Sequence, residues 1–206
     1  MEVTELDVFF DYNCPFVYRA AKMLEAVAGS GRRALKTNWR YFSLSQVNHR
    51  SDDPRDAWTV WNAPESEPVK GRLAFKAAEA ARRQERFTAF HSMLLDARHR
   101  DRLDIESAEV LEDVAGRAGL DLDRFWRDVA DPRILDSLER DHTEARGVHG
   151  VFGTPTLLFP GGAAYLRLAC VLEGDDALRV FDSVSGTIAR EPEVLEIKRP
   201  VPPAAG

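Results

Sequence analysis

Strand-forming segments lie at the two ends of this chain, and the long segment between them has helical patterns. Leu6 to Phe10 and Lys36 to Leu44 are short runs rich in β-branched and aromatic residues, which is typical of buried strands. Strand character returns at residues 154–172, after residues 69–147, whose apolar side chains recur at helical spacing. Few folds place strands on both sides of such a helical excursion.

A helix is expected between the first two strands. Pro15 suits the first helical position, where its missing N–H leaves no helical hydrogen bond unmade, and Gly29-Ser30-Gly31 ends the helix. Two strands joined by a helix predict a parallel β-α-β unit with a right-handed crossover. The apolar positions of this helix that fit one face are Phe16, Val17, Ala20, Leu24, Val27 and Ala28.

The last third of the chain predicts a hairpin followed by a helix. Residues 154–159 and 165–172 have strand character, and Pro160-Gly161-Gly162 is typical of the turn between them. A final helix follows, capped by Asp175 or Asp176. Its inward side chains are expected to be Leu178, Phe181, Val184 and Ile188.

The complete order is therefore β-α-β, a helical block, and β-β-α. This order predicts an α/β chain with a thioredoxin-like fold that carries a large inserted helical subdomain. The thioredoxin-like core is expected at residues 1–44 and 148–190. Residues 45–147 are expected to be a long loop followed by the helical insertion, and residues 191–206 a mobile C-terminal tail.

Composition narrows the classes of partner and location. The 206 residues carry a net charge of −6, which argues against nucleic acid as a partner because such surfaces need a basic excess. No apolar run is long enough to span a membrane. The N-terminus has no basic segment followed by an apolar one, so we expect no secretory signal and a cytoplasmic location. The two cysteines, Cys14 and Cys170, are too few for a disulfide scaffold.

Cys14 is the strongest candidate for a catalytic residue. It follows Asp-Tyr-Asn at a predicted turn and precedes Pro15, which places it at the N-cap of the first helix. A thiolate is the nucleophilic form of cysteine, and the free N–H groups and positive dipole end of a helix N-terminus stabilise negative charge. The alternative, a small apolar residue at the end of a strand, fits less well because a structural cysteine normally lies inside an apolar stripe.

The second candidate is the tetrapeptide Gly153-Thr154-Pro155-Thr156. A proline that opens a strand lacks one ladder donor. If the Thr154–Pro155 bond is cis, the chain turns sharply there and exposes the preceding backbone to a ligand.

Together these motifs resemble those of the DsbA-type thioredoxin-like proteins, over roughly residues 6–190. The resemblance rests on Asp-Tyr-Asn-Cys14-Pro15-Phe16, on the helical insertion, and on Gly-Val-Phe-Gly-Thr-Pro155-Thr after it. Family members carry Cys-Pro-x-Cys at a helix start, facing a cis-proline. The helical block and the Gly-Thr-Pro-Thr form are similar to a cytosolic actinobacterial branch that uses mycothiol. The resemblance implies that Thr154 and Pro155 pair with substrate and that Pro15, Phe16 and Val17 line its groove.

The sequence departs from the family at the second cysteine, whose position is occupied by Val17. Cys14 then has no local partner, and Cys170 is expected to be a core residue of the last strand. A single thiolate attacks a disulfide and waits for an external thiol to resolve it. We therefore expect a monothiol oxidoreductase that has no tightly bound cofactor and acts on a small thiol or disulfide with mycothiol or glutathione.

Two alternatives remain open at this stage. Kappa-class glutathione transferases and hydroxychromene carboxylate isomerases are similar to this architecture and also lack a dithiol. They activate the thiol of bound glutathione with a serine at the same helix start, a role of which Cys14 would be a variant. The other alternative is a degenerate thioredoxin-like module that only binds.

The remaining polar and aromatic residues carry weaker signals. His142 is expected on the inward face of the helix before the Thr-Pro loop, where it either tunes Cys14 or is a hydrogen-bonded core histidine. Trp58 and Trp61 either cover a ligand or pack between the insertion and the core. The histidines show no metal-ligand spacing, so no metal is expected. A homodimer is left open.

Overall fold

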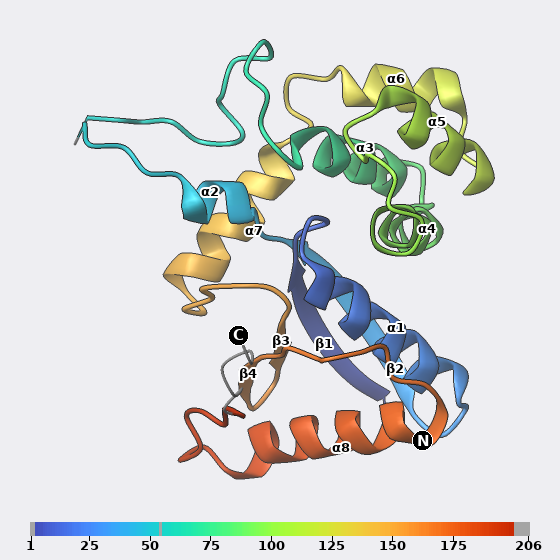
Figure 1. Ribbon diagram of the computed structural model, residues 1–206, viewed down its shortest axis with the longest axis vertical. Coiled ribbons are helices and arrows are strands. Elements are labelled where there is room, and N and C mark those ends of the chain that lie inside the picture. Colours follow the sequence, from blue (N-terminus) through green and yellow to red (C-terminus); the bar gives the residue numbers. More distant parts are fainter. Residues whose placement is uncertain (1–2, 54, 200–206) are drawn as a thin grey trace, which may run out of the picture.

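The fold is built on one four-stranded mixed sheet (Figure 1). The structure is a computed structural model that describes residues 3–53 and 55–199. The strand order is β2-β1-β3-β4, in which β1 runs parallel to β2 and antiparallel to β3, and β3 runs antiparallel to β4. The bounds are β1 Val3–Phe10, β2 Ala34–Tyr41, β3 Thr156–Phe159 and β4 Gly162–Tyr165.

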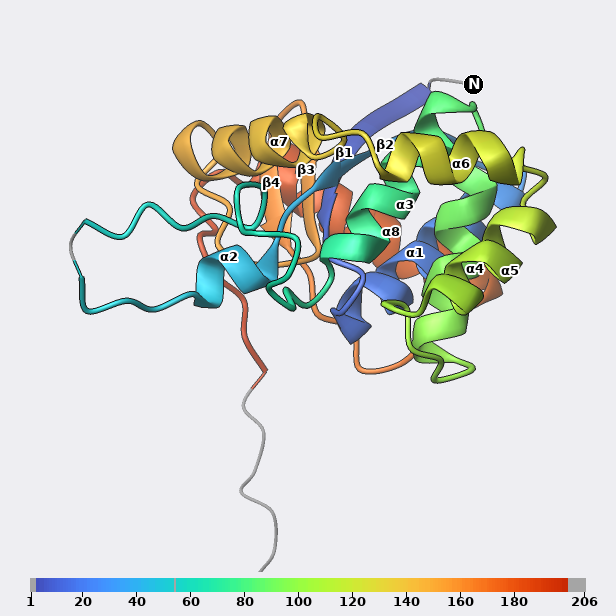
Figure 2. The ribbon, with the colours of Figure 1, turned by 90° about the horizontal axis from the view of Figure 1, so that it is seen from above.

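Helices cover both faces of this sheet and form a separate block at one end of it (Figures 1 and 2). Helices α1 and α8 lie against one face, and α7 lies against the other. Helices α3 to α6 pack together as the inserted block. The bounds are α1 Pro15–Gly29, α2 Leu44–Asn48, α3 Arg72–Arg83, α4 Phe87–His99, α5 Ala108–Arg117, α6 Leu122–Val129, α7 Asp136–Gly147 and α8 Gly174–Arg190.

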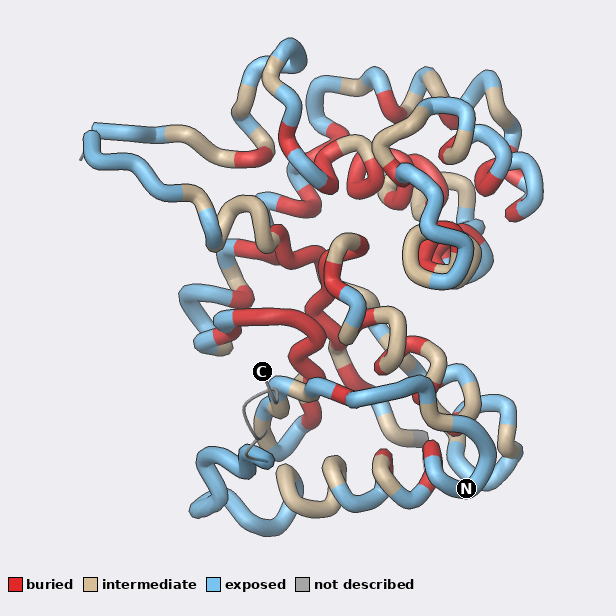
Figure 3. The backbone as a smooth tube through the Cα atoms, viewed as in Figure 1, coloured by how far each residue is buried: buried red, intermediate tan, exposed pale blue. Residues whose placement is uncertain are grey.

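The alternation of side chains along β1 explains how the sheet is covered on both faces. Successive residues of a strand point to opposite sides. Leu6 and Val8 are buried among side chains of α1 and α8. Phe9, on the opposite side, is buried with Phe42 after β2 and with Ala145 of α7. Figure 3 shows the buried residues concentrated along the sheet and on the inward faces of the helices.

A third and larger core cluster joins the inserted helices to the end of the sheet. Phe10, Tyr12 and Cys14 belong to this cluster together with Phe75 of α3 and Phe90 of α4. The carboxyl end of β1 and the start of α1 are therefore packed against the insertion. Cys14 lies where the sheet, α1 and the inserted helices meet.

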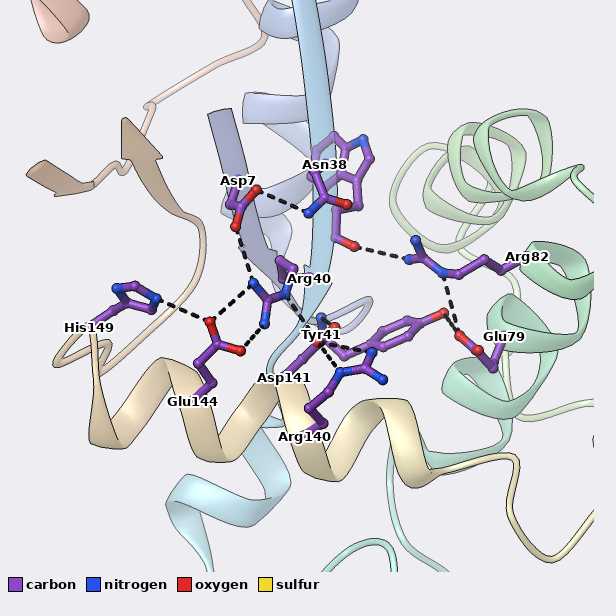
Figure 4. Close-up of polar contacts among 11 residues, drawn as sticks. Asp7, Asn38, Arg40, Tyr41, Glu79, Arg82, Arg140, Asp141, Glu144 and His149 are labelled. Atoms are coloured by element: carbon purple, nitrogen blue, oxygen red, sulfur yellow. Dashed lines mark hydrogen bonds and ion pairs between the residues drawn. The ribbon is translucent and has the colours of Figure 1, made fainter. Parts of the chain in front are cut away.

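A polar network around β2 fixes the helices on either side of that strand (Figure 4). The Arg40 guanidinium donates to Asp7 at 3.2 Å, and to Asp141 and Glu144 of α7 at 3.0 and 2.7 Å. Tyr41 on the same strand donates its hydroxyl to Glu79 of α3 at 2.9 Å. The two bonded carboxylates of α7 raise the pKa of Arg40 against the opposing effect of burial, so its charge is retained.

The predicted α/β class and the element order are confirmed, and the differences are local. The second strand ends at Tyr41, three residues before the predicted Leu44, because Ser43 caps α2 by accepting from Gln46. The predicted long loop therefore begins with a helical turn. The final helix begins at Gly174 with Glu173 as its N-cap, so Asp175 and Asp176 lie in its first turn and are not caps.

The observed hairpin is shorter than the predicted one, and its second strand lies earlier in the chain. Its second strand is β4, and residues 166–172 are not a strand. Leu166 still donates to the Pro155 carbonyl, next to the last pair of the hairpin, but beyond it the Leu168 carbonyl accepts from Arg19 of α1. Cys170 is exposed, so its predicted place in the core was wrong. Residues 191–199 of the expected tail form no helix or strand, and residues 200–206 lie outside the described residues.

Candidate functional site around Cys14

Cys14 is the N-cap residue of α1, as the sequence predicts. Its backbone N–H donates to the Asp11 carbonyl at 3.0 Å, which closes the turn that leaves β1. Its own carbonyl accepts from Val17 at 3.1 Å, and Pro15 is the first helical residue. The residue is buried, with 5% of its surface exposed.

The Cys14 sulfur faces the loop that precedes β3. The Thr154–Pro155 peptide bond is cis, and the Cys14 thiol donates to the Thr154 carbonyl oxygen at 3.1 Å. Strand pairing explains this meeting of distant segments, because Phe9 at the end of β1 lies opposite Thr156 at the start of β3. The same end of the sheet therefore carries the cysteine and the Thr-Pro pair.

The Thr154 side chain is also buried beside this contact. Thr154 is 2% exposed, and its hydroxyl has no hydrogen-bond partner among the described residues. A buried hydroxyl without a partner is costly. The neighbouring Thr156 differs, because its hydroxyl donates to the Gly153 carbonyl at 2.8 Å.

The first turn of α1 holds no second thiol, because Val17 occupies the position after Phe16. Val17 is fully buried in the cluster that contains Cys14. Cys170 is a free, exposed cysteine on the segment that follows β4. That segment runs along α1, with Arg167 over Phe16 and the Leu168 carbonyl at Arg19 one turn later, so it carries Cys170 away from Cys14.

Asp11 is part of this site, although the sequence indicates it only as a turn former. It is 1% exposed, and its carboxylate accepts from the backbone N–H of Asn13 at 2.8 Å and of Leu44 at 2.7 Å. Burial raises the pKa of Asp11, and these two hydrogen bonds oppose that effect. The residue ties the cysteine turn to the start of α2. Its signal in the sequence was Asp-x-Asn, the pattern of an Asx turn.

Gly71 supports the same turn from the insertion side. Its φ is +89°, a left-handed conformation that glycine adopts without a steric penalty. A Cβ atom at this position would lie 2.8 Å from the side-chain amide nitrogen of Asn13. Glu106 accepts from the Gly71 N–H at 3.0 Å and from Leu73 at 3.2 Å, which holds the start of α3 in place.

The histidines near this end of the sheet are structural. His142 accepts from the Ser43 N–H through Nδ1 at 3.1 Å, which is the core-histidine alternative. Burial, with a smaller contribution from Arg146, lowers the pKa of His142 to about 4. His99 donates through Nε2 to the Tyr12 carbonyl at 2.8 Å, and burial lowers its pKa.

The two tryptophans of the long loop pack on other protein groups. Trp58 stacks on His49 at a centroid distance of 4.1 Å and donates to Glu67. The Trp61 ring lies 5.6 Å from that of His142. Both pack against the large core cluster that contains Cys14.

The rim of the site combines an aromatic pair with two cations. Phe152 and Tyr165 are 63% and 40% exposed, and their rings meet edge-on at 4.9 Å. The Phe16 ring, next to Pro15, lies beneath the guanidinium groups of Arg167 and Arg19, at 4.2 and 5.3 Å.

Neither a metal centre nor a membrane span is found in the described part of the chain. Within residues 3–53 and 55–199, no group of three or more His, Cys, Asp or Glu side chains is placed to hold a metal ion. No helix of the same residues is long and apolar enough to cross a membrane.

The sheet order, the helical insertion, and a helix-capping cysteine opposite a cis-proline define a thioredoxin-like protein with an inserted helical subdomain. The family model described as a DSBA-like thioredoxin domain matches residues 5–183. The chain belongs to this family, which confirms the resemblance drawn from its motifs.

Three similar proteins have between 18% and 26% sequence identity to this chain. An uncharacterized protein of Mycobacterium tuberculosis, Rv2286c, is 26% identical over 98% of this chain and 84% of its own length. The oxidoreductase DsbA from Xylella fastidiosa superposes with a TM-score of 0.57 and 19% identity, covering 92% of this chain and 86% of that one. A 2-hydroxychromene-2-carboxylate isomerase superposes with a TM-score of 0.62 and 18% identity, covering 94% and 100%. At these identities the two structures show a shared fold.

Proposed function

We propose that this protein is a monothiol oxidoreductase in which Cys14 exchanges disulfides with the help of a low-molecular-weight thiol. The observation that carries the proposal is the contact of 3.1 Å between the Cys14 sulfur and the carbonyl oxygen of Thr154. In this contact one cysteine at a helix N-terminus lies beside the turn formed by the cis Thr154–Pro155 bond, where a bound sulfur would meet both. Family membership supports the oxidoreductase class.

The reaction follows from having one sulfur at the site. The Cys14 thiolate attacks a mixed disulfide between a substrate and a small thiol. A bond forms between Cys14 and the small-thiol sulfur, the original S–S bond breaks, and the substrate thiolate leaves and takes a proton from water. A second small thiol, as its thiolate, then attacks the adduct, which regenerates Cys14 and releases the symmetrical small disulfide. Overall one disulfide is exchanged for another: the substrate sulfur is reduced to a thiol, and the incoming small thiol is oxidised as it takes the place of that sulfur in the released disulfide.

The neighbouring residues have distinct parts in this scheme. The backbone of Thr154 and the ring of Pro155 would align the substrate sulfur with Cys14. Pro15 and Phe16 would form the rim that the small thiol contacts. Val17 replaces the resolving cysteine, so the cycle depends on an external thiol such as glutathione or mycothiol, and no tightly bound cofactor is required.

The test uses a peptide disulfide-linked to glutathione or to mycothiol, with the matching free thiol as reductant. Wild-type protein should release the peptide thiol catalytically, and intact-mass spectrometry should find a one-thiol adduct on Cys14. Cys14→Ser should abolish both results, whereas Cys170→Ser should change neither.

Other outcomes would contradict the proposal in separate ways. If Cys14→Ser kept thiol-dependent turnover, a hydroxyl would be sufficient and the transferase mechanism would replace this one. If the wild type bound the peptide but never formed an adduct or turned over, the protein would be a binding module.

A further inference from the structure

Two arginines share one aromatic ring at the rim of the cysteine site. Arg167 lies 4.2 Å above the Phe16 ring centroid and Arg19 lies 5.3 Å from it. Arg19 also donates to the Leu168 carbonyl at 2.7 Å, which fixes its position, while Arg167 is exposed. A guanidinium held over a ring keeps the N–H groups on its edge available for a carboxylate.

These two charges have no counter-ion within the described residues. Most arginines in residues 3–53 and 55–199 that lie at the surface pair with a carboxylate, but no carboxylate of those residues lies within 4.0 Å of Arg19 or Arg167. The charge of Arg19 is felt near the cysteine turn. Burial lowers the pKa of His99, whose ring is bonded to the Tyr12 carbonyl, and the charges of Arg98 and Arg19 lower it further, against the effect of that hydrogen bond.

The two arginines are connected to the cis-proline as well as to the helix. Leu166 donates to the Pro155 carbonyl at 3.0 Å, and Arg167 is the next residue. Phe16 is two residues after Cys14. The cationic rim is therefore built from the same two segments that bring the sulfur and the Thr-Pro turn together.

We propose that Arg167, assisted by Arg19, binds the carboxylate of an anionic small thiol whose sulfur reacts at Cys14. This inference rests on the proposed function and specifies its co-substrate. The protein carries a net charge of −6, so its overall field repels anions. A local pair of uncompensated cations is what an anionic thiol requires at this site, and an uncharged thiol gains nothing from it.

Charge distinguishes glutathione from mycothiol, the two small thiols between which the sequence does not decide. Glutathione carries two carboxylates within a few bonds of its sulfur, whereas mycothiol is a pseudodisaccharide without a carboxylate. The cationic rim favours a thiol of the first kind.

The test compares three small disulfides of similar size and different charge: dithiodipropionate, a dianion; hydroxyethyl disulfide, which is uncharged; and cystamine, a dication. The second-order rate of adduct formation on Cys14 is measured for each by quenched mass spectrometry. In Arg167→Gln the rate ratio of dianion to neutral disulfide should fall about tenfold relative to wild type, the effect of losing one charge-assisted contact. Arg167→Lys should keep part of the preference, and added salt should slow the dianion relative to the neutral disulfide.

Arg117→Gln is the matched control, because it removes the same charge from an exposed site on α5. It should leave the ratio unchanged. If Arg167→Gln leaves the ratio unchanged while Cys14 reacts with all three disulfides, the inference is wrong and the proposed function stands. If Cys14 forms an adduct with none of them, both fail together.

Discussion

His142 should make folding stability depend on pH in a predictable way. Its Nδ1 accepts from the Ser43 N–H, and its ring packs on Phe42 and Trp61 at 4.6 and 5.6 Å. Protonation would turn that acceptor into a second donor facing an N–H group. Burial, and to a smaller degree Arg146, therefore lower the pKa of His142 to about 4, from about 6.5 in the unfolded chain.

The sign and size follow from proton linkage. Between these two pKa values the unfolded chain binds more protons than the folded one, so acid favours unfolding. The stability contributed by neutral His142 is complete above about pH 6.5 and is lost as pH falls toward about 4. Between pH 7.5 and pH 5 the loss from this group is about 2 kcal/mol.

The test is urea unfolding of wild type and His142→Asn at both pH values. An asparagine amide oxygen lies near the former Nδ1 and still accepts, but it does not titrate. The variant should be less stable overall because ring packing is lost, yet wild type should lose about 2 kcal/mol more than the variant between pH 7.5 and pH 5. Thr143→Ala, an exposed neighbour, should match wild type. An equal pH dependence in wild type and His142→Asn would refute the reasoning, since the buried His91, whose pKa burial lowers to about 3, is unchanged in the variant.

Three further perturbations have clear expected results. Arg40→Met should lower the free energy of unfolding by about 3 kcal/mol in urea titrations because it removes the cation that joins the buried Asp141 to Asp7 and Glu144, whereas the exposed Arg133→Met should cost almost nothing. Gly71→Ala should lower the free energy of unfolding by about 1 to 3 kcal/mol, measured by thermal unfolding. A change under about 0.5 kcal/mol would contradict the positive φ and close contact found there. Val17→Cys places a thiol one helical turn from Cys14, so oxidation with hydroxyethyl disulfide should give an internal disulfide, seen as a loss of two hydrogens, and insulin reduction that wild type lacks.

The start of α1 could be predicted because its determinants are local. Cys14 and Pro15 follow a strong strand and a turn-forming triplet, and each residue type favours the conformation it adopts. The partnership with Thr154 was reached through family resemblance, since no local pattern specifies which distant loop a strand end will meet. Strand register decides that, and register depends on the whole sheet.

The misassigned segment shows the opposite case. Leu166 to Leu172 has more strand character than Gly-Ala-Ala-Tyr, yet the small residues form β4. After Leu166, which bonds to Pro155 beside the hairpin, the apolar segment is held by the bond from Arg19 of α1 to the Leu168 carbonyl, so tertiary context overrides propensity there. The unpaired charge of Arg167 was invisible in sequence for the same reason, because composition does not show which arginine lacks a counter-ion.

Because Cys14 is packed between the sheet and the inserted helices, the reactivity of its sulfur can report on that packing. Because Cys14 is only 5% exposed, a bulky thiol reagent reacts with it only when the packing shared by β1, α1 and the inserted helices opens. If reclosing is faster than modification, the labelling rate reports the population of the opened form, as amide exchange does. The labelling rate of Cys14 thus measures the free energy that holds the helical block to the core.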